Sequence, residues 1–123
     1  MEAFAISIPS SATGKKSTPL VHAFLRCLLL GTSPAAYISL CKAIAEAPVP
    51  LYSNIKVPLL IIVGGDDTTA PRDGADHIIE QCGSKKKELR ILEGVGHWHV
   101  LEAYAEVQGL IGSFLKDIRE SSR

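Results

Sequence analysis

Two stretches decide how this sequence folds, and each runs from an apolar segment into ionisable residues. Residues 60–71 read LIIVGGDDTTAP, and residues 93–102 read EGVGHWHVLE. The first stretch follows Pro58 and is a continuous, largely β-branched run that ends in two glycines and two aspartates. A strand that is apolar at every position is covered on both faces, as parallel strands in α/β proteins are. The pattern therefore predicts a buried parallel strand over residues 59–63.

The rest of the second half predicts a helix, another strand and a final helix. A helix is expected over Asp73–Cys82, with Gly83 as its stop, and a strand over Leu89–Leu92. The last helix carries apolar residues at helical spacing, namely Val107, Leu110, Ile111, Phe114, Leu115 and Ile118. This stripe is expected to pack against the sheet. The order predicts a βαβα unit on two parallel strands.

Two shorter helices are predicted in the first half of the chain. Thr18–Pro19 and Ser33–Pro34 each combine an N-cap residue with a proline in the first turn. The segment before them is polar and rich in turn-forming residues, so we expect it to be irregular. The sequence thus predicts a helical segment with an irregular N-terminus at residues 1–50, followed by the βαβα part at residues 51–123.

The composition indicates one modest folded domain and excludes several classes of partner. The chain has 123 residues, of which 46% are apolar, and its 13 basic residues balance its 13 acidic ones. No net field attracts nucleic acid or an anionic membrane, so neither is expected as a partner. No basic leader with a cleavage site begins the chain, which favours a cytoplasmic location. The three cysteines have no metal-ligand spacing and are expected to be buried, reduced thiols.

The polar residues after the two predicted strands are expected to meet. Asp66 and Asp67 follow the first strand, and His97 and His99 follow the second. Parallel strands end at the same edge of a sheet, and ligands bind beyond that edge. A carboxylate there can fix the tautomer and orientation of an imidazole that acts as a general base.

These residues resemble the α/β-hydrolase fold family, and within it the 3-oxoadipate enol-lactonase-like hydrolases. The resemblance runs from about Leu28 to the last helix. The family's acid strand is matched at Gly64, Asp67 and Pro71, and its histidine loop at Gly94, Gly96, His97, Trp98 and Glu102. The resemblance implies a partial α/β-hydrolase fold, in which the C-terminal βαβα unit of a parallel sheet is preceded by cap-type helices.

The resemblance also implies roles for individual residues. Asp67 is expected to be the triad acid, Asp66 its exposed neighbour and His97 the general base. The residues themselves favour Trp98 as a wall of the substrate pocket or a packing residue, and His99 as a loop residue or one that supports the site without taking part in catalysis. Asp66 is also suited to capping the turn after Gly65. The implied substrate is a small ester, lactone or related acyl compound, and no cofactor is implied. Asp66, Asp67, His97 and His99 also have side chains suited to a metal ion. On this architecture we expect no metal site.

The sequence departs from the family at the nucleophile. No G-x-S-x-G motif occurs among the 123 residues, and Ser10, Ser33 and Ser113 do not follow a buried strand. We therefore expect the C-terminal part of a hydrolase that is inactive alone, and whose open sheet edge favours self-association. The alternative is a noncatalytic remnant or binding module on the same scaffold.

Overall fold

The computed structural model describes residues 1–121 and divides the chain into two compact units. The first unit consists of residues 1–11 and 18–50, and the second consists of residues 12–17 together with the chain from Leu51 onward. The short segment 12–17 therefore belongs to the second unit, although helices of the first unit precede and follow it.

The first unit contains the helices α1 (Glu2–Ser11), α2 (Pro19–Leu30) and α3 (Pro34–Glu46). The predicted starts of α2 and α3 are confirmed. The Thr18 and Ser33 side chains accept hydrogen bonds from main-chain N–H groups in the first turns, and a proline occupies the first turn of each helix. Gly31 ends α2, where its N–H donates to the carbonyl of Cys27 at 3.0 Å.

The expectation of an irregular N-terminus is wrong for residues 2–11, which form α1. The hydroxyls of Ser7 and Ser10 donate to carbonyls of the preceding turn, so these polar side chains are satisfied within the helix. Contact with α2 stabilises α1: Ala5 and Leu25 are buried, and the Arg26 guanidinium donates to the Ala5 carbonyl at 3.4 Å. Tertiary packing thus overrides the turn-like composition of this segment.

The burial expected for the cysteines is wrong for two of the three. Cys27 and Cys41 are exposed, whereas Cys82 is buried. Among residues 1–121, no single helix is long and apolar enough to cross a membrane. Together α2 and α3 meet that test of length and composition, as a pair bent by 96°.

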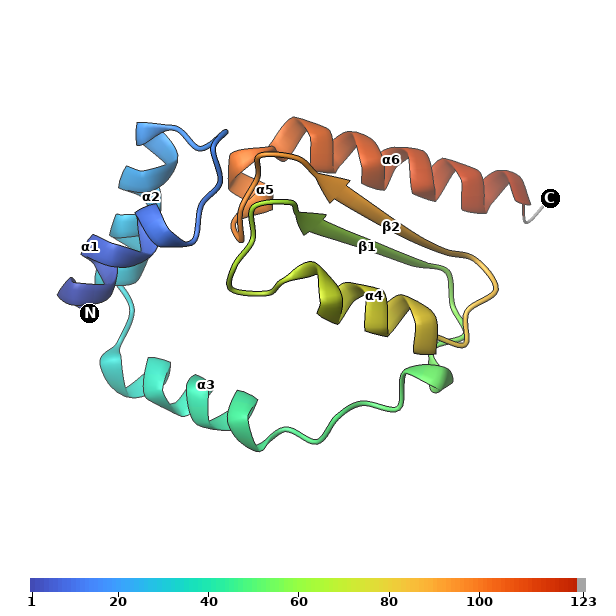
Figure 1. Cartoon of the computed structure of the whole chain (residues 1–123), viewed down its shortest axis with the longest axis horizontal. Coiled ribbons are helices and arrows are strands. Elements are labelled where there is room, and N and C mark those ends of the chain that lie inside the picture. The colour runs from blue at the N-terminus through green and yellow to red at the C-terminus, as the bar shows by residue number, and fades with distance from the viewer. Residues whose placement is uncertain (122–123) are drawn as a thin grey trace. The chain divides into compact units, whose positions relative to one another are not determined.

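The second unit has the predicted βαβα order. The strands β1 (Leu59–Gly64) and β2 (Lys87–Leu92) are parallel and in register from Leu59↔Lys87 to Gly64↔Leu92. The remaining elements are a 3₁₀ turn, η1 (Tyr52–Asn54), and the helices α4 (Arg72–Gln81), α5 (His99–Glu102) and α6 (Tyr104–Ser121). In Figure 1 the strand pair lies between α4 and α6. The second strand begins two residues earlier than expected, and α5 was not predicted.

Successive side chains of β1 pack on opposite faces of the sheet. Ile62 packs with Ala103 and Leu110 against a buried cluster of Leu92, Val95 and Val107. Ile61 and Val63, on the opposite face, line an apolar hollow with residues of α4 that include Ala75 and Ile78. The helices α6 and α4 therefore cover opposite faces of the strand pair.

One edge of β1 has no neighbouring strand among residues 1–121. The sheet consists of β1 and β2, and the N–H groups of Leu59 and Gly65 donate to the β2 side, to Lys86 and Leu92. Because the hydrogen-bonding direction alternates along a strand, the main-chain groups of Ile62 point to the other edge. This edge of β1 can accept a further strand.

We expect the Leu92→Ala variant to lose stability because Leu92 is only 1% exposed at the centre of the buried cluster. Truncation leaves a cavity, and the free energy of unfolding should fall by about 2–5 kcal/mol. Leu115→Ala makes the same chemical change at a side chain that is 54% exposed, and should cost about 0.5 kcal/mol or less. Urea unfolding measures both, and equal losses would contradict this description of the core.

Candidate active site

The ends of β1 and β2 are tied together by main-chain contacts. Beyond β1, Gly65 N–H donates to the Leu92 carbonyl at 2.8 Å, and Asp66 N–H donates to the Val95 carbonyl at 2.9 Å. A Cβ atom on Gly64 would collide with the carbonyl oxygens of Val95 and Gly96. The absence of a side chain at Gly64 therefore lets the histidine loop, residues 93–98, lie directly against the end of β1.

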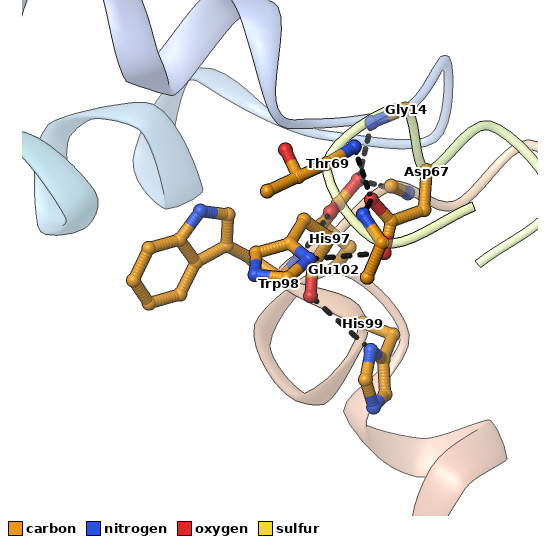
Figure 2. Close-up of polar contacts among 9 residues, drawn as sticks. Gly14, Asp67, Thr69, His97, Trp98, His99 and Glu102 are labelled. Atoms are coloured by element: carbon orange, nitrogen blue, oxygen red, sulfur yellow. Dashed lines mark hydrogen bonds and ion pairs between the residues drawn. The ribbon is translucent and has the colours of Figure 1, made fainter. Parts of the chain in front are cut away.

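Asp67 lies in the turn after β1, and its carboxylate has three partners. Its Oδ1 accepts from the N–H groups of Thr69 at 2.8 Å and Ala70 at 2.9 Å. Its Oδ2 lies 3.0 Å from Nδ1 of His97. Figure 2 draws this contact as a dashed line between the two labelled side chains. The Asp67 side chain is only 5% exposed. The turn thus aims one carboxylate oxygen at the histidine ring.

The hydrogen bonds around Asp67 stabilise its ionised form. Burial alone would raise the pKa of Asp67, but the hydrogen bonds from Ala70, His97 and Thr69 outweigh burial and lower the pKa below its ordinary value of 3.8. Asp67 is therefore a carboxylate at neutral pH and can orient an imidazole and stabilise its protonated form.

His97 presents one ring nitrogen to Asp67 and keeps the other available. An imidazole that donates from Nδ1 to Asp67 carries its lone pair on Nε2, the arrangement that a general base needs. The His97 side chain is 40% exposed, so a reactant can reach the ring. The expected convergence of Asp67 and His97 at the carboxyl edge of the two parallel strands is confirmed as geometry.

The other residues singled out from the sequence lie around this pair. The Asp66 carboxylate accepts from Lys15 N–H at 3.2 Å. Trp98 packs its indole edge-to-face on the His97 ring, with centroids 6.1 Å apart, and His99 Nδ1 lies 3.2 Å from the His97 carbonyl. Within the part of the chain that the structure describes, no group of three His, Cys, Asp or Glu residues is placed to hold a metal ion.

Sequence reasoning did not assign a role to Glu102 or to the segment 12–17. The Glu102 carboxylate accepts hydrogen bonds from the N–H groups of Gly14 and Trp98, both labelled in Figure 2, and from that of Gly96. In addition, His97 N–H donates to the Ala12 carbonyl at 2.9 Å. The position of Glu102 in the histidine-loop motif was its only signal in the sequence, and main-chain partners such as Ala12 leave no signal.

Comparisons with known proteins agree with this fold. Residues 26–103 match the family model described as Hydrolase_4: Serine aminopeptidase, S33. No curated protein sequence matches the chain.

Two solved structures resemble the chain at 18% and 21% sequence identity. A serine hydrolase involved in carbazole degradation (CarC enzyme) superposes with a TM-score of 0.75 over 94% of this chain and 47% of its own. Est816, described as an N-acyl homoserine lactone degrading enzyme, superposes with a TM-score of 0.73 over 91% of this chain and 46% of its own. The chain thus spans about half the length of each structure, and these likenesses show a partial α/β-hydrolase fold.

The lowered pKa of Asp67 predicts an acid-dependent contribution to stability. For a carboxylate whose pKa is lower in the folded state, this contribution is fully present above the ordinary value of 3.8 and is lost as the pH falls through the lower folded value. Asp67→Asn should therefore be less stable than the wild type near neutral pH, and the difference should shrink in acid. Urea unfolding between about pH 2 and pH 7 measures this.

Asp117→Asn is the control for this experiment because it removes one exposed carboxylate from α6. The free energy of unfolding of Asp117→Asn should differ from that of the wild type by the same small amount at every pH. If the free energies of unfolding of Asp67→Asn and the wild type differed by the same amount at every pH, this would contradict a lowered pKa for Asp67.

Proposed function

Because this chain belongs to the Hydrolase_4 (serine aminopeptidase, S33) family of α/β-hydrolases, we propose that it carries the acid and the general base of a serine hydrolase. The observation that supports this most directly is the 3.0 Å contact between buried Asp67 and the accessible ring of His97. The substrate class we propose is a small ester, lactone or related acyl compound. The chain's sequence motifs resemble those of 3-oxoadipate enol-lactonase-like hydrolases, and the similar structure Est816 is described as degrading a lactone.

In the proposed reaction Asp67 keeps the His97 ring oriented while Nε2 moves a proton. Nε2 takes the proton of a serine hydroxyl as the serine oxygen bonds to the acyl carbon, and returns it to the leaving oxygen as the acyl bond breaks. Water then repeats the sequence on the acyl-enzyme, which releases the acid and restores the serine. The protonated imidazole formed in each half is stabilised by the ionised Asp67.

The serine nucleophile in this proposal lies outside the 123 residues, since they contain no G-x-S-x-G motif. The free edge of β1 supplies a place for strands that carry such a motif. When those strands are absent, the same edge favours association of two copies of the chain.

We expect the 123-residue chain alone to hydrolyse an activated ester such as p-nitrophenyl acetate at the background rate. Asp67 and His97 alone supply neither a nucleophile nor donors that stabilise the oxyanion. Loss of a single oxyanion donor already lowers kcat by roughly 10²- to 10³-fold. The rate of the chain should equal that of its His97→Ala variant. Turnover well above background that His97→Ala abolishes would mean that a nucleophile lies within this chain.

A chimera tests the proposed roles directly. The half of Est816 that this chain does not cover, joined to this chain, should hydrolyse a lactone, and Asp67→Asn should lower kcat by about 10⁴-fold because the imidazole loses its correct tautomer. His97→Gln should lower kcat of the chimera by at least as much. His77→Gln is the matched control, because His77 lies in α4 and packs edge-on against Tyr52.

The chimera also separates the two candidate functions. Activity that is unaffected by Asp67→Asn and His97→Gln would contradict the catalytic roles. A chimera that folds, as judged by its circular dichroism and thermal transition, but has no turnover would instead favour the noncatalytic binding module.

A further inference from the structure

We propose that Glu102 is a positioning residue that holds the main chain on both sides of His97 and fastens the segment 12–17 to it. The inference rests on the proposed function in one respect only, namely that His97 is the general base. The contacts themselves are structural and can be tested without turnover.

The Glu102 carboxylate is used entirely on main-chain donors. Its Oε2 accepts from Gly14 N–H at 2.7 Å and from Gly96 N–H at 3.1 Å, and its Oε1 accepts from Trp98 N–H at 3.2 Å. An ionised carboxylate has acceptor sites on both oxygens and no donor, so it can bind all three amides together. A glutamine cannot, because its NH₂ group would face an N–H donor on one side.

Three consecutive main-chain amides in the histidine loop are bonded outside the loop's own backbone. Gly96 and Trp98 donate to Glu102, and His97 between them donates to the Ala12 carbonyl at 2.9 Å. With its own amide and both neighbours fixed, the Cα of His97 has little freedom. The Cα–Cβ direction determines where the ring can go, so Glu102 acts on the ring through the backbone.

The single turn of α5 brings Glu102 back onto the loop. The N–H groups of Leu101 and Glu102 donate to the Trp98 carbonyl at 2.8 and 3.0 Å, which closes this turn. The carboxylate of the last residue of α5 therefore lies beside amides that precede the helix.

The segment 12–17 is held against the loop by close backbone packing as well as by hydrogen bonds. Lys16 N–H donates to the Gly94 carbonyl at 2.7 Å. A Cβ atom on Gly96 would lie 2.6 Å from the carbonyl carbon of Thr13, and one on Gly14 would lie 2.6 Å from Gly96 N. Only glycine at both positions permits this approach. Glu102 bonds an amide on each side of the junction, so its carboxylate joins the two segments.

Amide hydrogen exchange and histidine ring NMR on the 123-residue chain test the proposal. In Glu102→Gln we expect protection to fall by roughly 10- to 100-fold at those of the Gly14, Gly96 and Trp98 amides that then face the NH₂ group, because they lose their acceptor. Protection should fall by less at the amides that still donate to the uncharged amide oxygen. The Nδ1–H resonance of His97, which requires a persistent bond to Asp67, should broaden or disappear. Amides of the β1–β2 ladder should keep their protection.

Glu106→Gln is the matched control. Glu106 is a nearby carboxylate in α6 that pairs with the Lys16 ammonium at 3.7 Å, with both side chains about half exposed. The substitution removes the same charge beside the same segment, and should leave the three amides and the His97 resonance unchanged. Equal changes in the two variants would overturn the proposal, because a general loss of negative charge would then explain them.

A conservative variant keeps the test decisive if Glu102→Gln does not fold. Glu102→Asp retains the charge but is one methylene shorter, so it should lose part of the protection and leave a weakened His97 resonance. Wild-type protection and an intact His97 resonance in either variant would overturn the proposal. Failure of the proposed function would give a different result. The turnover of the chimera would then be unchanged by Asp67→Asn and His97→Gln, while the NMR changes in Glu102→Gln would still be observed.

Discussion

The parallel pairing of β1 with β2 is the constraint on which the candidate site depends. Its register ends at Gly64↔Leu92, and both strands deliver their next residues to the same edge of the sheet. Asp67 follows its strand through a tight turn. The histidine loop is longer and turns back at Gly94, where φ is +75°, before it reaches His97. A shift of the pairing by one residue would reverse the faces of the strand and separate the two side chains.

The carboxylates of Asp67 and Glu102, near the carboxyl ends of β1 and β2, are stabilised in the same way but bind different groups. Asp67 and Glu102 each accept two or more hydrogen bonds from main-chain N–H groups, which offset the cost of removing a charge from water. Asp67 uses its remaining oxygen on the ring of His97. Glu102 uses both oxygens on the backbone. The ring and the backbone of one histidine are thus held by separate carboxylates.

The sequence predicted those parts of the structure that leave a side-chain pattern. The β-branched run before Gly64 predicted β1, the helical spacing after Val107 predicted α6, and the acid and histidine loops predicted the approach of Asp67 to His97. The helix α1 was missed because its burial against α2 outweighs a serine- and proline-rich composition. The contact of segment 12–17 with the histidine loop was missed because main-chain hydrogen bonds can be made by almost any residue.

His97 lies beyond the carboxyl ends of β1 and β2, and a strand that pairs with the free lateral edge of β1 can end beside it. A further parallel strand added to β1 would also finish at the carboxyl edge, beside the turn that holds Asp67. A residue on the turn after such strands would approach the pair from the solvent side, where the 40% exposed His97 is open. Asp67 occupies the Nδ1 side of the ring, so the nitrogen left to meet an incoming hydroxyl is Nε2, the atom that a general base uses.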